Sequence, residues 1–242
     1  MRHLRIAFGL LTTLPLRLPG NWSAGDSGRA AVWYPFVGLI IGLLTWLTWR
    51  GATLVFPSLV AGVIALAVWV LLTGGLHLDG LADCCDGLFV SAAPERRLEI
   101  MKDPHMGAFG VIGLLIILLL KAAALSSLSL IAGLGILLAA SLARWCILLA
   151  ALLPQARASG MGADFASGFR RSFIFWGAII PVALAVLTGA RGLFSILIGV
   201  GAAGLIVWLA KSRIGGVTGD VFGMTVELVE AFALLAFVFG SS

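Results

Sequence analysis

Charged side chains are scarce in this 242-residue chain, which is 61% hydrophobic and only 11% charged. A soluble domain normally carries about a quarter charged residues. A water-soluble fold could not hide so much apolar surface, and the bilayer must therefore be the solvent. The net charge of +5 indicates no nucleic-acid partner, because with so few charges their positions mark membrane topology.

Cysteine is equally scarce, with Cys84, Cys85 and Cys146 as its three copies. Two of them are adjacent and the third sits in an apolar run, which excludes a disulfide framework. His77 precedes Cys84 by seven residues, and this is not a familiar zinc spacing. We interpret the cysteines as small buried hydrophobic residues.

Long apolar runs are abundant, and a spanning helix needs about 20 mostly apolar residues. The runs that meet this need lie near 31–49, 57–76, 106–123, 128–150, 173–190, 192–210 and 221–240. The expected fold is an all-α, polytopic integral membrane helical bundle of about seven spans, forming one domain over 1–242. Residues 3–14 are expected to add an amphipathic helix in the cytoplasmic interface, since Leu4, Phe8 and Leu11 recur at helical spacing.

The basic residues fall mainly on one side of this topology. Segments 1–30, 77–105, 151–172 and 211–220 hold Arg2, Arg5, Arg17, Arg29, Arg96, Arg97, Lys102, Arg157, Arg170, Arg171, Lys211 and Arg213. The other side holds only Arg50, Lys121 and Arg191. Because positive charge stays in the cytoplasm, this bias places the N-terminus and the large loops there.

Three aspartates form the most unusual feature of the chain. Asp83 and Asp86 follow Asp79 by four and seven residues. On a helix, about 100° per residue puts the three carboxylates within roughly 60° of one another. Such a stripe of like charge weakens a helix unless a cation neutralises it. Mg²⁺ is the expected cation, because it takes carboxylate oxygens and completes its shell with water or substrate phosphate.

A second acidic group lies in the last apolar run. Asp220 stands at its cytoplasmic start, and Glu227 follows by seven residues on the same helical face. Acids inside a membrane are costly and usually functional. The preceding turn contains Gly216 and Gly219, whose backbone N–H groups are candidates to approach a phosphate.

Three further charged residues are candidates for the same site. Arg144 lies inside the fourth run at a depth similar to that of Glu227, where it either clamps an anionic ligand or forms a structural ion pair. We favour the shared site. Lys102 and Asp103 precede the third run. Lys102 is a candidate for holding phosphate, and Asp103 is a candidate for a further metal ligand or an orienting group. Together, the acids, cations and glycine turns indicate phosphoryl transfer from a diphosphate.

Several motifs resemble the cobalamin-5′-phosphate synthase (adenosylcobinamide-GDP ribazoletransferase) family. The matching segments are 74–83 (GGLHLDGLAD), Asp86-Gly87, 97–103 (RLEIMKD) and 215–220 (GGVTGD), with 11–15 (LTTLP) and 34–38 (YPFVG) in support. Several separated segments match in order, and the resemblance covers nearly the whole chain.

The resemblance implies a Mg²⁺-dependent, multi-pass transferase of a bacterial inner membrane, with its active site facing the cytoplasm. A hydroxyl of α-ribazole, or of its 5′-phosphate, would attack the phosphorus attached to cobinamide in adenosylcobinamide-GDP, and GMP would leave. Asp79, Asp83 and Asp86 would bind Mg²⁺. Asp220 and Glu227 would complete a second metal site or supply the base, while Lys102 and Arg144 would hold phosphate charge.

Two other functions stay open. A CDP-alcohol phosphotransferase of lipid synthesis uses similar aspartates, but Asp79-Gly80 is not followed by the Ala-Arg of its usual signature. A cation-coupled transporter would also use intramembrane acids, although here the acids gather near the cytoplasmic side. The sequence leaves open the number of metal ions and the preferred acceptor. It also leaves open whether the protein is a homo-oligomer.

Overall fold

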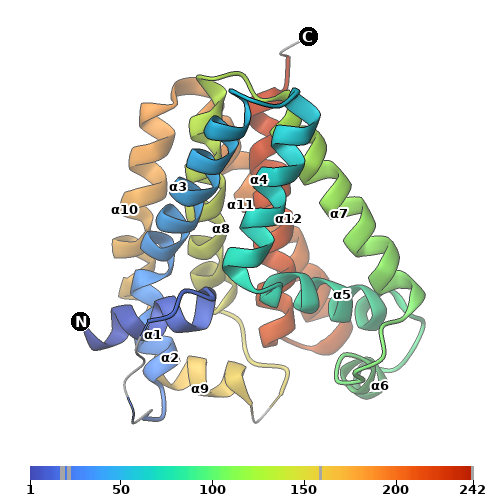
Figure 1. Ribbon diagram of the computed structural model, residues 1–242. Coiled ribbons are helices and arrows are strands. Elements are labelled where there is room, and N and C mark those ends of the chain that lie inside the picture. Colours follow the sequence, from blue (N-terminus) through green and yellow to red (C-terminus); the bar gives the residue numbers. More distant parts are fainter. Residues whose placement is uncertain (17–19, 21–22, 158–159, 241–242) are drawn as a thin grey trace.

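Long helices run side by side along the molecule in the computed structural model (Figure 1), which describes residues 1–16, 20, 23–157 and 160–240. They are α3 (Tyr34–Ala52), α4 (Ser58–Thr73), α7 (Ala108–Ser127), α8 (Gly135–Ala150), α10 (Ser172–Leu187), α11 (Gly189–Ile214) and α12 (Gly219–Val238). Each coincides with one of the apolar runs, so the expected helical membrane bundle is confirmed.

Within the described residues, five helical segments are each long and apolar enough to cross a membrane. The number reaches seven if two bent pairs each count as one span. In one pair α4 meets α5 (Leu76–Phe89) at 90°, and in the other the end of α9 (Met161–Gly168) meets α10 at 99°. Since α4 and α10 lie along the bundle while α5 and α9 turn across it (Figure 1), we treat only α4 and α10 as spanning parts.

Short helices gather at the lower end of the bundle in Figure 1. They are α1 (Arg2–Leu11), α2 (Asp26–Ala30), α5, α6 (Pro94–Ile100) and α9, and two 3₁₀ turns, η1 (Ala31–Trp33) and η2 (Ala132–Leu134), precede α3 and α8. The expected N-terminal helix is present as α1, which ends where Thr12 becomes extended. Ile6 and Leu11 are buried, so its apolar face packs against the bundle.

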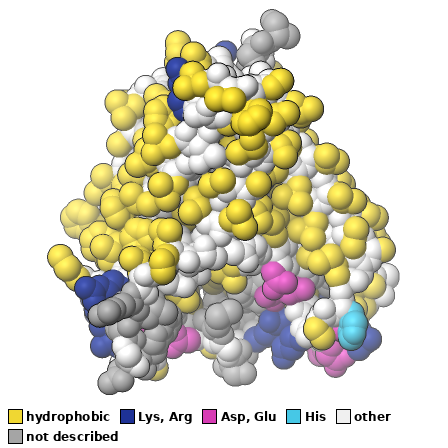
Figure 2. Space-filling view, viewed as in Figure 1, with side chains coloured by type: hydrophobic (Ala, Val, Ile, Leu, Met, Phe, Trp, Pro, Cys, Tyr) yellow, Lys and Arg dark blue, Asp and Glu magenta, His cyan; other side chains and the backbone are white. Residues whose placement is uncertain are grey.

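The interior is formed mainly by α8 and α12, whose alanine, leucine and valine side chains are almost fully buried. Large apolar side chains on α7 and α11 instead face outward, as Leu119 and Leu197 do with 68% and 69% exposure. Figure 2 shows hydrophobic side chains over most of the visible face and most of its charged ones near the lower end. This distribution is that of a protein whose solvent is lipid.

Two glycines reorient the chain between α4 and α5. Gly74 and Gly75 have φ angles of 63° and 71°, a left-handed conformation that glycine adopts without steric cost. They end α4 and send α5 across the base of the bundle, which fixes the direction of the acidic stripe.

One expected marker of the outer side, Lys121, is buried within the bundle. We expected this residue on the outer side of the membrane with Arg50 and Arg191. Instead it lies on the buried face of α7, and only 2% of the residue is exposed. A buried partner explains this position, as described below. Arg17, expected on the cytoplasmic side, lies outside the described residues.

Candidate active site

The helices α5 and α12 cross at two glycines. A Cβ atom added to Gly80 would lie 2.8 Å from the carbonyl oxygen of Asp220, and one added to Gly223 would lie 3.0 Å from that of His77. Larger side chains would therefore force the two backbones apart. The crossing places the acidic stripe of α5 beside the first turn of α12.

Three of the predicted acids meet at this crossing. Asp79 and Asp83 lie one turn apart on α5, outside the spanning segments, and Asp220 lies in the first turn of α12. The pKa of Asp83 is raised to about 7, first by burial and then by the carboxyl groups of Asp220 and Asp79, while the guanidinium of Arg157 opposes the rise. A cation placed here would relieve the repulsion among the carboxylates.

A cavity of about 490 Å³ with mostly apolar walls opens beside the acids. Its lining residues are Gly9, Leu10, Leu11, Ser27, Tyr34, Leu76, His77, Asp79, Gly80, Ile147, Gly160, Gly162, Asp164, Phe165, Gly219, Asp220, Phe222 and Gly223. Three aromatic rings contribute to one wall, where the centroid of Phe165 lies 6.0 Å from that of Tyr34 and 5.4 Å from that of Phe222. The cavity therefore joins an aromatic wall to an acidic edge.

A smaller polar recess of about 70 Å³ adjoins the cavity through shared walls at Gly160, Gly162, Gly219 and Asp220. Arg157 lines this recess, and its Nη1 donates to Oδ2 of Asp220 over 3.1 Å. The hydroxyl of Thr218 donates to the same carboxylate oxygen over 3.2 Å. Asp220 thus stands between the cavity and the recess, and on the side of the recess its carboxylate pairs with Arg157.

Asp86 has a structural role at the start of α7. Its carboxylate accepts hydrogen bonds from the backbone N–H groups of Gly107 and Gly110, over 2.8 and 2.9 Å. A carboxylate at a helix N-terminus satisfies donors that lack intrahelical partners. Both oxygens of Asp86 are thereby occupied, and its part in metal binding stays a prediction.

Glu227 and Arg144 lie apart from the cavity, in a buried charge network. Lys121 donates to Glu227 over 2.8 Å and also to Glu230, which in turn accepts from Arg144. These side chains are all at most 5% exposed, and the two positive and two negative charges balance. The structural ion pair weighed for Arg144 is therefore what the structure contains, and neither Arg144 nor Glu227 is among the cavity-lining residues.

The remaining candidates lie either at the surface or where two backbone segments pack closely. Lys102 and Asp103 lie in an exposed turn after α6, where Asp103 accepts from the backbone N–H of His105 over 2.9 Å. Neither lines the cavity or the recess. Gly216 packs tightly, since a Cβ atom there would lie 2.3 Å from the carbonyl oxygen of Pro154. Of the predicted phosphate-contacting residues, Gly219 alone lines the cavity and the recess.

The predicted metal ligands do not form a closed cage. Within the part of the chain that the structure describes, no three Asp, Glu, His or Cys side chains are grouped so that they could hold a metal ion. Mg²⁺ does not need such a cage, because it is usually bound by one or two carboxylates together with waters and substrate phosphates. One or two of the carboxylates of Asp79, Asp83 and Asp220 would suffice for that mode of binding.

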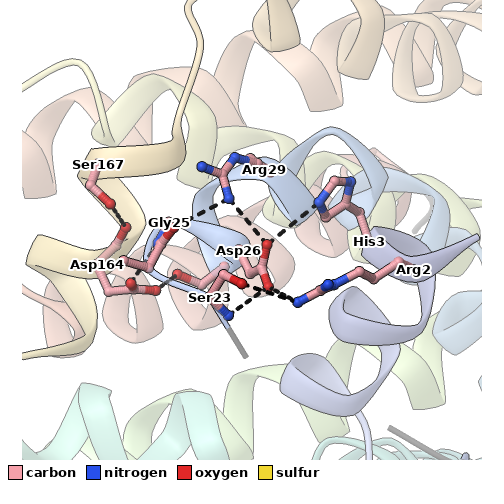
Figure 3. A network of polar contacts seen from close by, with 10 residues as sticks. Arg2, His3, Ser23, Gly25, Asp26, Arg29, Asp164 and Ser167 are labelled. Atoms are coloured by element: carbon pink, nitrogen blue, oxygen red, sulfur yellow. Dashed lines mark hydrogen bonds and ion pairs between the residues drawn. The ribbon is translucent and has the colours of Figure 1, made fainter. Parts of the chain in front are cut away.

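A polar network at the lower end ties α1, α2 and α9 together (Figure 3). Asp26 accepts from Arg2 over 2.6 Å, from Arg29 over 3.1 Å and from the backbone N–H of Ser23 over 2.9 Å. Asp164 on α9 accepts from the backbone N–H of Gly25 over 2.7 Å and from the hydroxyl of Ser27. This network fixes α9, and with it the ring of Phe165 in the aromatic wall of the cavity.

Sequence reasoning missed Arg157, Asp164 and the Asp26 network. Arg157 was counted only as a topology marker, because an arginine in a connecting segment has no periodicity that reveals its target. Asp164 is likewise a lone acid in a short segment. One signal for Arg157 was available from topology. Its segment, 151–172, was expected on the same side of the membrane as the glycine-rich turn at 215–219.

A profile of the cobalamin-5-phosphate synthase family matches residues 3–238 of the chain. Three relatives carry the name adenosylcobinamide-GDP ribazoletransferase. That of Ectopseudomonas mendocina is 44% identical over 243 residues, which cover 96% of each protein. That of Pseudomonas entomophila is 38% identical over 95% of this chain and 96% of the relative, and that of Desulfitobacterium hafniense is 35% identical over 97% and 96%. No solved structure matches the chain.

Proposed function

The chain belongs to the cobalamin-5-phosphate synthase family, and on that premise we propose that it joins α-ribazole, or its 5′-phosphate, to adenosylcobinamide-GDP and releases GMP. The product would be adenosylcobalamin or its 5′-phosphate. The observation that carries this proposal is that Asp79 and Asp220 line a largely apolar cavity, with the carboxyl group of Asp83 close enough to both for their charges to raise its pKa.

The cavity suits the acceptor better than the corrinoid. Its volume of about 490 Å³ lies in the range of pockets that enclose drug-sized ligands, a class to which a benzimidazole riboside belongs and a corrin ring with its side chains does not. The rings of Tyr34, Phe165 and Phe222 offer faces against which a flat aromatic base can stack. The corrinoid would then remain outside, with only its diphosphate reaching the acids.

Mg²⁺ would be held by Asp79 and Asp83, with the substrate diphosphate as a further ligand. The support is the raised pKa of the partly buried Asp83, to which the carboxyl groups of Asp220 and Asp79 contribute by a repulsion that a cation would relieve. When bound, the ion would neutralise charge that develops on the diphosphate during transfer.

Asp220 is the best-placed residue to take the proton of the attacking hydroxyl. It lines the cavity that would hold the acceptor and also the recess beside it, whereas Glu227 is engaged with Lys121. A new bond would form between the ribose hydroxyl oxygen and the phosphorus carried by cobinamide, and the bond from that phosphorus to the oxygen of GMP would break. The proton would pass to the carboxylate of Asp220.

The site would face the cytoplasm of a bacterial cell. The short helices α1, α2 and α6 at the cavity end carry Arg2, Arg29, Arg96 and Arg97, and positively charged segments remain on the cytoplasmic side of a membrane. Soluble substrates on that side would reach the cavity without crossing the bilayer.

Purified full-length protein in liposomes tests the function directly. We expect GMP and a complete cobamide in equal amounts when adenosylcobinamide-GDP is supplied with α-ribazole or its 5′-phosphate, in the presence of Mg²⁺ but not of excess chelator. Liquid chromatography with mass spectrometry measures both products. Release of neither product with either acceptor would refute the proposal, and a transporter would give that result.

A further inference from the structure

Two residues that line the polar recess beside Asp220 carry buried donors for which the described residues supply no acceptor. Nη1 of Arg157 reaches Asp220 and its Nη2 reaches the carbonyl oxygen of Leu98 over 3.3 Å. Its buried Nε and the buried Nε2 of Gln155 have no acceptor among the described residues. Buried donors without partners are costly and uncommon in native proteins, which indicates that this recess receives an acceptor-rich group.

The backbone around Arg157 is held firmly against the turn before α12. The N–H of Ala156 donates to the carbonyl oxygen of Val217 over 2.8 Å, and the N–H of Val217 donates to that of Pro154 over 2.9 Å. The close approach of Gly216 to Pro154 belongs to the same contact. The glycine-rich turn therefore positions the arginine, and the arginine faces the first turn of α12.

The size and charge of the recess select its occupant. A volume of about 70 Å³ admits a few waters or one small polar group but no base or sugar. An arginine presents five N–H donors in a planar fork that matches phosphate oxygens. Lys121 and Arg144 pair with buried glutamates, although Nε and Nη2 of Arg144 have no acceptor among the described residues. Lys102 is at the surface. Of these four cations, Arg157 is the one that reaches an acid at the crossing.

We propose that Arg157, together with Gln155, forms the subsite that binds the phosphate of the nucleotide part of the substrate. This inference rests on the proposed function for the identity of the nucleotide. On binding, Arg157 exchanges the carboxylate of Asp220 for phosphate oxygens.

GMP is the probe for this subsite, because it carries the phosphate that would leave in the reaction. Equilibrium dialysis of GMP against full-length protein in detergent, with chelator present, measures binding without turnover. We expect Arg157→Gln to weaken GMP binding about ten- to a hundredfold, the loss that removal of charge-assisted hydrogen bonds causes. Arg157→Lys should restore part of the affinity. Arg171→Gln, at an exposed arginine that immediately precedes α10, is the matched control and should bind as the wild type does.

Asp220→Asn separates the exchange from a purely structural role. Loss of the carboxylate charge frees Arg157 for phosphate, so this variant should bind GMP more tightly than the wild type while losing turnover. If Arg157 only held Asp220 in place, GMP affinity would be unchanged in both Arg157→Gln and Asp220→Asn, and that result overturns the proposal. Thermal unfolding of each variant identifies any that is misfolded. If Arg157→Gln is misfolded, Arg157→Lys supplies the comparison.

The two proposals fail in different ways. Wild-type GMP release with unchanged GMP binding by Arg157→Gln would overturn the subsite and leave the transferase function intact. Absence of wild-type GMP release, with GMP binding that depends on Arg157, would support the subsite and refute the transferase function.

Discussion

The contact between α5 and α12 should control activity more strongly than it controls stability, and Gly80→Ala isolates it. The added methyl carbon would lie 2.8 Å from the carbonyl oxygen of Asp220, and ordinary contact begins at 3.4 Å, so the two backbones must separate by about 0.6 Å. Overpacking costs about 1–3 kcal/mol, whereas alanine in place of a helical glycine contributes about 0.5–1 kcal/mol. The net loss of stability is therefore small, at roughly 0–2.5 kcal/mol.

The same displacement should be severe for the reaction, because misplacement of reacting groups by about 1 Å can lower a rate about a hundredfold. We expect Gly80→Ala to lower GMP release to that extent while unfolding within a few degrees of the wild type. Gly201→Ala on α11 is the control, since its added carbon meets no atom within 4 Å, and it should be fully active. Full activity of Gly80→Ala would refute the view that this crossing positions the acids.

Three further substitutions test the supporting contacts. Lys121→Met leaves Glu227 and Glu230 without one buried partner and should destabilise the protein by about 3–5 kcal/mol in thermal unfolding; an unchanged melting temperature would contradict the network. Asp86→Asn weakens the bonds that begin α7 and should cost about 1 kcal/mol, with faster hydrogen exchange at the first amides of α7, and exchange as slow as in the wild type would count against this role. Asp26→Asn should raise hydrogen exchange in α1 and leave that of α11 unchanged, whereas equal exchange in α1 would show that Asp26 does not anchor it.

The spans could be predicted from the sequence because lipid imposes a simple rule on composition. Runs such as 106–123 and 192–210 have to be helical, since backbone groups in hydrocarbon must satisfy one another. The direction of α5 could not be predicted in the same way. It depends on the left-handed turn at Gly74 and Gly75. A pair of glycines in a sequence does not by itself predict that the chain turns by 90°.

The acidic half of the site was visible for a different reason. The spacing of Asp79 and Asp83 places both on one helical face, and their charge is conspicuous in an apolar chain. The role of Arg144 was harder to predict, because a charge inside an apolar run looks alike whether it binds a ligand or another side chain. Arg144 proved to pair with Glu230, while Arg157, in a connecting segment, reached Asp220 through a tertiary contact across 63 residues of sequence.

The central claim is that Asp79, Asp83 and Asp220 form the place where a Mg²⁺-bound diphosphate is cleaved. The most direct measurement is the Mg²⁺ dependence of GMP release from adenosylcobinamide-GDP in liposomes, compared between the wild type and Asp83→Asn. Loss of a metal ligand should lower the rate by more than the roughly 10- to 100-fold that loss of an outer-shell partner causes, and should raise the Mg²⁺ concentration needed for half-maximal rate. A variant that releases GMP at the wild-type rate with the same Mg²⁺ dependence would contradict the account.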